Sequence, residues 1–256
     1  MTPSIFIAKC FLVFSQDTVL IPLIVLGYLW LDRRLFSQAT CLLFLSMLLN
    51  YAEKISFQIP LAEHLGPGFA FPSGHMQSAC AFYGWLAFRL PSIRLRLGIV
   101  VLLLGIGYGL IRLGYHQIQD LIAAVLSAAL LIVGYLKFLY QDSARTLFLK
   151  IGLATILLGY IYLQGPSVPK ASWLAYYALL GFSIALYLQP KSQTKIPIRS
   201  HLSQKALATF LFFISFLIIH QVFQKLSTIH PELPPYLSES QWLLIGFILP
   251  NLATRP

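Results

Sequence analysis

The chain has 256 residues, of which 58% are hydrophobic and only 10% are charged, against about 25% charged residues in a soluble domain. A soluble protein of this length cannot bury so much apolar surface, so most of the chain is expected to lie in lipid. The net charge is +10, but the basic residues lie in short loops between apolar runs, which indicates membrane orientation and not nucleic-acid binding. The three cysteines lie apart in apolar segments and predict neither a disulfide framework nor a metal site.

The apolar runs predict an all-α, polytopic membrane protein with about eight or nine transmembrane helices, because lipid offers no hydrogen-bond partner for a strand edge. Segment 4–14 is short and is followed directly by polar residues, so it is expected to lie in the membrane interface, with a short span as the alternative. In chain order the runs are roughly 18–31, 36–49, 76–88, 97–111, 118–135, 147–163, 173–188, 206–222 and a weaker 242–252.

The loops between these runs alternate between two sides of the membrane. Side A receives thirteen of the 18 lysines and arginines, side B receives four, and Lys9 is unassigned. The four on side B are Lys54, Arg112, Lys170 and Lys225. The positive-inside rule predicts that side A is cytoplasmic and that side B faces the exterior or the periplasm. The protein is expected in a bacterial inner (plasma) membrane.

A candidate anion site lies on side B, where Phe71-Pro72-Ser73-Gly74-His75 directly precedes an apolar run. Pro72 cannot continue a preceding helix, Ser73 is a good N-cap, and Gly74 lets backbone approach a ligand. The helix that follows would aim free N–H groups and its positive dipole end at this loop. His75, at the same place, is suited to give a proton to a leaving oxygen.

A second constellation is formed by His116 and Asp120, also on side B. They are four residues apart, so a helix that starts here places them on one face. A carboxylate bonded to one imidazole nitrogen sets the tautomer and leaves the other nitrogen free as a nucleophile. Gly114 permits a tight turn just before them.

Together, Pro72-Ser73-Gly74-His75 and Gly114-Tyr115-His116-x3-Asp120 resemble the type 2 phosphatidic acid phosphatase superfamily, over about residues 4–136. That family has a helical core and three motifs: Lys-x6-Arg-Pro, Pro-Ser-Gly-His and Ser-Arg-x5-His-x3-Asp. The resemblance implies two regions, a phosphatase-like core at 1–140 and additional transmembrane helices of unknown role at 141–256.

By this resemblance, His116 would form a phosphohistidine, Asp120 would orient it, and His75 would protonate the leaving group. Lys54, Ser73 and Gly74 would hold the phosphoryl oxygens. No cofactor or metal is expected, since the carboxylates near side B show no metal-ligand pattern.

Two arginines of the family pattern are missing. Leu61 and Leu110 stand at the arginine positions of the first and third motifs, and Gly109 stands at the serine position of the third. Each charge-assisted contact is worth roughly 1.5–3 kcal/mol, so two absences would weaken transition-state binding strongly. Arg112, four residues before His116, is a candidate for partial compensation; a snorkelling anchor is the alternative.

The first hypothesis is therefore a membrane phosphatase that acts on a lipid phosphate or diphosphate at the outer face. The resemblance admits isoprenyl diphosphates, phosphatidic acid and phosphatidylglycerophosphate as substrates, and transfer of the phosphate to another lipid instead of water. The alternative is a degenerate, non-catalytic relative that binds lipid or a membrane partner. A transporter has little support, because the sequence has no repeated broken helices.

Overall fold

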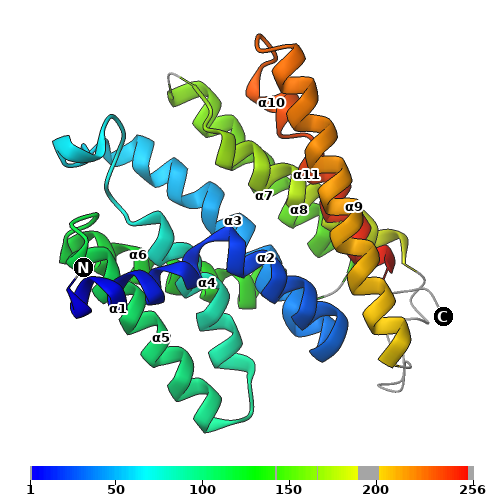
Figure 1. Ribbon diagram of the computed structural model, residues 1–256, viewed down its shortest axis with the longest axis horizontal. Coiled ribbons are helices and arrows are strands. Elements are labelled where there is room, and N and C mark those ends of the chain that lie inside the picture. Colours follow the sequence, from blue (N-terminus) through cyan, green and yellow to red (C-terminus); the bar gives the residue numbers. More distant parts are fainter. Residues whose placement is uncertain (1, 142, 166, 190–201, 253–256) are drawn as a thin grey trace.

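The computed structural model describes residues 2–141, 143–165, 167–189 and 202–252. Over these ranges the chain is helical and forms no strand, apart from an isolated bridge between Pro60 and Phe69. The all-α expectation is confirmed for this part of the protein (Figure 1). The main helices are α1 (Pro3–Leu12), α2 (Asp17–Leu26), α3 (Arg33–Phe57), α4 (Gly74–Arg89), α5 (Ile93–Arg112), α6 (Ile118–Gly134), α7 (Ala144–Gln164), α8 (Lys170–Leu188), α9 (Leu202–Ile229), α10 (Pro235–Ser238) and α11 (Gln241–Leu252).

Six helices of the described chain are long and apolar enough to cross a membrane: α3, α5, α6 with its extension to Leu139, α7, α8 and α9. The expected count of eight or nine is not confirmed. With 16 and 12 residues, α4 and α11 are about 24 and 18 Å long, short of a hydrocarbon layer about 30 Å thick.

The N-terminal segment pairs with the helix after it. Pro3–Ser15 and Asp17–Leu31 meet at a bend of 49° and are together long and apolar enough to form a broken span or a re-entrant loop, which brings the total in the described chain to as many as seven. α1 packs along α5, and Ala8 is fully buried there. The segment is therefore packed into the bundle and does not only lie in the interface.

Close helix pairs rely on glycine, as is common where lipid gives no hydrophobic drive for association. A Cβ on Gly109 of α5 would lie 2.7 Å from the carbonyl oxygen of Ala8 on α1. A Cβ on Gly181 of α8 would lie 2.0 Å from the carbonyl oxygen of Leu243 on α11. These backbones approach so closely that no side chain fits between them.

α3 is the central helix, in contact with α4, α7 and α8, and α4 in turn contacts α5 and α6. Leu42, Leu45 and Leu48 of α3 are fully buried. Asp32 caps the start of α3 by accepting a hydrogen bond from the Leu35 N–H at 2.8 Å. The ends of α3 and α5 and the starts of α4 and α6 meet at one face, which is the face where the candidate site lies.

Candidate active site

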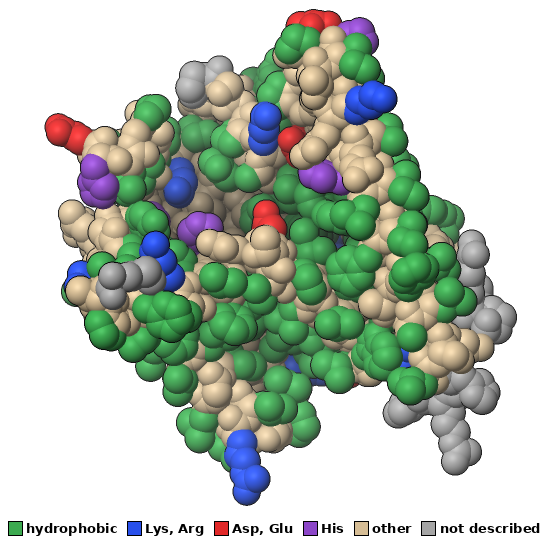
Figure 2. Space-filling view, in the orientation of Figure 1, with side chains coloured by type: hydrophobic (Ala, Val, Ile, Leu, Met, Phe, Trp, Pro, Cys, Tyr) green, Lys and Arg blue, Asp and Glu red, His purple; other side chains and the backbone are tan. Residues whose placement is uncertain are grey.

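A backbone hydrogen bond joins the two sequence motifs. The Ser73 N–H, at the start of α4, donates to the carbonyl oxygen of Asp120, on α6, at 3.2 Å. The loop that was expected to bind an anion is therefore tied to the His116–Asp120 pair. In Figure 2, basic, acidic and histidine side chains gather around a hollow on the visible face, whereas hydrophobic side chains cover most of the remainder.

His116 and Asp120 form the pair that their spacing predicted. Nδ1 of His116 lies 3.3 Å from Oδ2 of Asp120, and both side chains are largely buried. The same carboxylate oxygen accepts a hydrogen bond from the Gln117 N–H at 2.9 Å, as part of a capping box at the start of α6. Gly114 has a φ of +73°, so the turn before the histidine uses the left-handed region, as expected.

This arrangement suits a neutral, nucleophilic imidazole. Burial lowers the pKa of His116 below its ordinary value of 6.5, the Asp120 carboxylate partly opposes this, and the charge of Lys54 lowers the pKa further. The proton on Nδ1 is directed to Asp120, which leaves Nε2 with a free lone pair at neutral pH.

His116 and Asp120 line a cavity of about 280 Å³. Its volume is close to the lower end of known ligand pockets and is appropriate for a small polar group such as a phosphate. The residues that line it are Ile59, Pro60, Leu61, Ala62, Ala70, Gly114, Tyr115, His116, Gln117, Gln119 and Asp120.

Ser73 occupies the N-cap position of α4, as expected, but its side chain makes no capping bond. Its hydroxyl oxygen is buried and has no hydrogen-bond partner among the described residues. A buried, unpaired hydroxyl is costly unless a ligand completes it. Gly74 follows, and a Cβ there would come within 3.0 Å of the Asn50 amide oxygen. The glycine is thus required by packing as well as by approach to a ligand.

Lys54 lies near the end of α3, and its Nζ donates to the carbonyl oxygen of Phe69 at 2.9 Å. It is close enough to influence His116 electrostatically. His75 is exposed, and its electrostatic partners are Lys54 and Asp17 at the α1–α2 bend. The phosphate-binding role of Lys54 and the acid role of His75 stay predictions, supported by this neighbourhood.

Arg112 is directed elsewhere. Its Nη2 donates to the hydroxyl of Ser4 on α1 at 3.3 Å, and its side chain is exposed and does not line the cavity. Its proposed role in phosphate binding stays a prediction, which requires the guanidinium to leave Ser4.

The structure shows where the three residues that depart from the family pattern lie. Leu61 lines the cavity, and Leu110 is fully buried with its carbonyl oxygen accepting from the His116 N–H at 3.4 Å. An arginine at position 61 would lie at the cavity, whereas Leu110 is not among the residues that line it. The third departure has a steric reason, because the backbone of Ala8 occupies the space that a serine at Gly109 would need.

Sequence reasoning missed a polar network behind the anion loop. The Asn50 amide donates both to the Pro72 carbonyl oxygen at 3.1 Å and to Gln77 at 2.7 Å. Gln77 donates to Ser127 at 2.9 Å, and Ser127 donates to Glu53. The signal was present, since Gln77 lies inside an apolar run and Asn50 directly follows one. The network holds α3, α4 and α6 together behind the loop.

Comparison with known proteins gives one match. The family model of the PAP2 superfamily matches residues 50–144, a stretch that contains all seven predicted site residues. No curated protein and no solved structure matches the chain. In the described residues no three histidine, cysteine, aspartate or glutamate side chains gather as a metal site. The match over residues 50–144 covers both motif loops, which the Ser73–Asp120 hydrogen bond joins, and it supports membership of the PAP2 superfamily, whose members are phosphatases that act on phosphate esters.

Proposed function

We propose that the protein is a membrane phosphatase that hydrolyses a lipid phosphate or diphosphate at the extracytoplasmic face. The observation that carries the proposal is the Ser73–Asp120 backbone hydrogen bond, because it holds the start of α4 against the His116–Asp120 pair. A phosphoryl group at the helix end would meet the nucleophile directly. The lipid nature of the substrate is supported by the setting, since the site lies at the ends of apolar helices.

In the first step, Nε2 of His116 attacks phosphorus and the bond from phosphorus to the leaving oxygen breaks. His75 gives its proton to that oxygen, so the alcohol or phosphate leaves in neutralised form. Asp120 stabilises the positive charge that develops on the imidazole. In the second step, His75 takes a proton from water, the water oxygen attacks the phosphohistidine, and inorganic phosphate departs from Nε2.

The charge on the transferring group needs stabilisation in both steps. Lys54 supplies a cation, the Ser73 hydroxyl supplies a free donor, and the Gly74 N–H and the dipole of α4 supply partial positive charge. These groups act without the two family arginines, so the protein is expected to be a weaker catalyst than a relative with all three motifs.

The orientation is part of the proposal. The excess of basic residues on side A supports a cytoplasmic location for that side and an external location for the site. The site would then receive a substrate whose head group projects from the outer leaflet.

Phosphate release by purified protein, over a panel of lipid phosphates and diphosphates, tests the activity. Wild type is expected to release phosphate and to be inhibited by vanadate, while His116→Ala abolishes turnover. A matched control is Gln119→Ala, which alters a cavity residue that has no chemical role in these steps. Full activity in His116→Ala would refute the mechanism.

A second function, that of a non-catalytic lipid-binding relative, is favoured specifically by Leu61 and Leu110 at the arginine positions. It predicts that wild type binds lipid phosphates but releases no phosphate from any member of the panel.

A further inference from the structure

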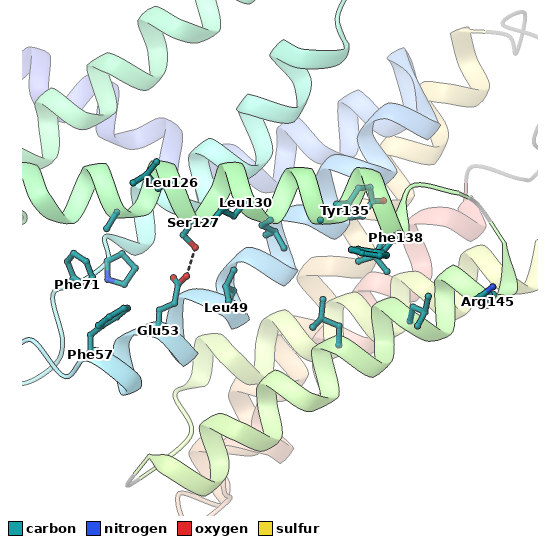
Figure 3. A pocket seen from close by; sticks show the side chains of 17 residues that line it. Leu49, Glu53, Phe57, Phe71, Leu126, Ser127, Leu130, Tyr135, Phe138 and Arg145 are labelled. Carbon is teal, nitrogen blue, oxygen red and sulfur yellow. Dashed lines mark hydrogen bonds between the residues drawn. The ribbon is translucent and has the colours of Figure 1, made fainter.

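A second and larger cavity lies behind the anion loop, within the membrane-spanning helices. It has a volume of about 890 Å³ and is an apolar groove between α3, α6 and α7 (Figure 3). We infer that this groove binds the hydrocarbon chain of the same lipid whose phosphate is bound at Ser73 and His116. The inference rests on the proposed function and adds to it a binding site for the hydrocarbon chain of the substrate.

The position of the groove connects it to the phosphate site. One end is formed by Phe71 and Pro72, which directly precede Ser73. Phe57 of α3 meets Phe71 edge to face at this end, with ring centroids 5.1 Å apart. The smaller cavity is lined by the adjacent Ala70. The smaller cavity and the groove are therefore lined by adjacent residues of one three-residue segment, 70–72, so one lipid molecule could occupy both.

The length of the groove suits a long chain. On α6 and its extension to Leu139, the groove extends from Ala123 to Leu139, which at 1.5 Å per residue is about 24 Å, most of the thickness of a hydrocarbon layer. Leu126, Leu130 and Phe138 follow one another along this wall in Figure 3. The groove opens between membrane-spanning helices, so membrane lipid can reach it. Its apolar lining favours a hydrocarbon ligand.

Polar side chains of the groove include Glu53 and Ser127, which are hydrogen-bonded to each other, and Arg145. The Glu53 carboxyl, one turn from Phe57, accepts the hydrogen bond from Ser127, and its second oxygen is buried without a hydrogen-bond partner among the described residues. It is near the head-group end, where a lipid carries its hydroxyl or amide donors. Arg145 lines the opposite end, on α7.

α7 begins at the C-terminal end of the family match, and most of it lies beyond residue 144. Leu149 and Leu153 of this helix complete the wall opposite α6. We therefore assign a role to part of the region 141–256: α7 closes the side of the groove that residues 50–144 alone would leave open.

Gly134 provides a sharp test, because it lines the groove and a Cβ there meets nothing within 4 Å. Gly134→Leu fills the groove without a backbone clash. Gly159→Leu is the matched control, since Gly159 of α7 has equally open space but does not line the groove. Kinetics are measured in detergent with two lipid phosphates that share a head group and differ in chain length.

Gly134→Leu is expected to raise KM for the long-chain substrate about tenfold, the effect of losing about two buried methylene contacts. KM for the short-chain substrate and kcat for both are expected to stay at the wild-type values, and Gly159→Leu is expected to behave as wild type throughout. Unchanged KM in Gly134→Leu, or an equal rise for both substrates, would overturn the inference.

A second measurement separates this inference from the proposed function. A long-chain lipid phosphate with a diazirine in its chain is photolysed with the His116→Ala protein, and the labelled residues are mapped. Labels on α3, α6 and α7 that an unmodified lipid phosphate removes support the groove, even if wild type shows no turnover. Labels that a neutral lipid of equal chain length removes equally well would show that bulk membrane lipid fills the groove, and would overturn the inference.

Discussion

The Asp120 carboxylate is the group whose replacement tests the site most sharply. One of its oxygens faces both the Gln117 N–H at 2.9 Å and Nδ1 of His116 at 3.3 Å. In Asp120→Asn, the amide must direct its oxygen to the Gln117 N–H, so the same oxygen stays beside His116. The substitution therefore removes the charge and keeps the geometry.

A charge-assisted hydrogen bond is worth about 1.5–3 kcal/mol and is about twice as strong as a neutral one. Loss of the charge should then cost about 1–1.5 kcal/mol of transition-state stabilisation, which is about a 5- to 12-fold decrease in kcat. Asp120→Ala removes the partner altogether and should cost about 1.5–3 kcal/mol, or about 10- to 150-fold.

The pH dependence distinguishes catalysis from structure. In the proposed mechanism the neutral form of His116 is the nucleophile, so activity should rise as pH increases through its pKa. Burial holds that pKa below 6.5, and the charge of Asp120 raises it. Without that charge the pKa falls further, so the acid limb of the kcat/KM profile should move to lower pH in Asp120→Asn.

The assay is phosphate release on one accepted lipid phosphate over a range of acidic pH, with circular dichroism and thermal unfolding as controls for the fold. A decrease in kcat with an unmoved acid limb would indicate that Asp120 acts only through the start of α6. An acid limb that moves to higher pH would refute the proposed pairing.

Three further outcomes are expected. Arg112→Ala should lower kcat/KM by about 10- to 100-fold if the guanidinium leaves α1 to contact phosphate. Unchanged kinetics would indicate that Arg112 only anchors the helix end at the membrane surface. Gln77→Leu should lower the unfolding free energy by about 1–3 kcal/mol, because it strands the buried Asn50 amide; wild-type stability in a denaturant titration would contradict this. In a cysteine-free background, an impermeant thiol reagent should label Glu63→Cys but not Ser92→Cys in intact cells; the reverse pattern would invert the orientation.

Several features of the site could be read from the sequence because they are local. His116 and Asp120 are four residues apart on one helix face, and Ser73 lies where proline ends the preceding segment. The left-handed turn at Gly114 needed only a glycine before a helix start. Local spacing also carried the resemblance to the superfamily, which the match over residues 50–144 confirmed.

The number of spans could not be read in the same way. Hydropathy identifies apolar runs, but α4 is shorter than a bilayer and is covered by α3, α5 and α6. Segment 4–14 looked too short to span, yet packing on α5 and a bend into α2 make it part of the bundle. Whether a short apolar helix crosses the membrane depends on the helices packed against it, and hydropathy carries no information about that packing.

The sequence by itself determined the helical membrane class and the pairing of His116 with Asp120, since apolar length and i, i+4 spacing act within one segment. Only the tertiary structure decided the Ser73–Asp120 bond, the contact of Ala8 with Gly109 and the groove between α3, α6 and α7. Each of these depends on which helices lie side by side. In lipid that choice is made by close packing and interhelical hydrogen bonds, whose partners are distant in the chain.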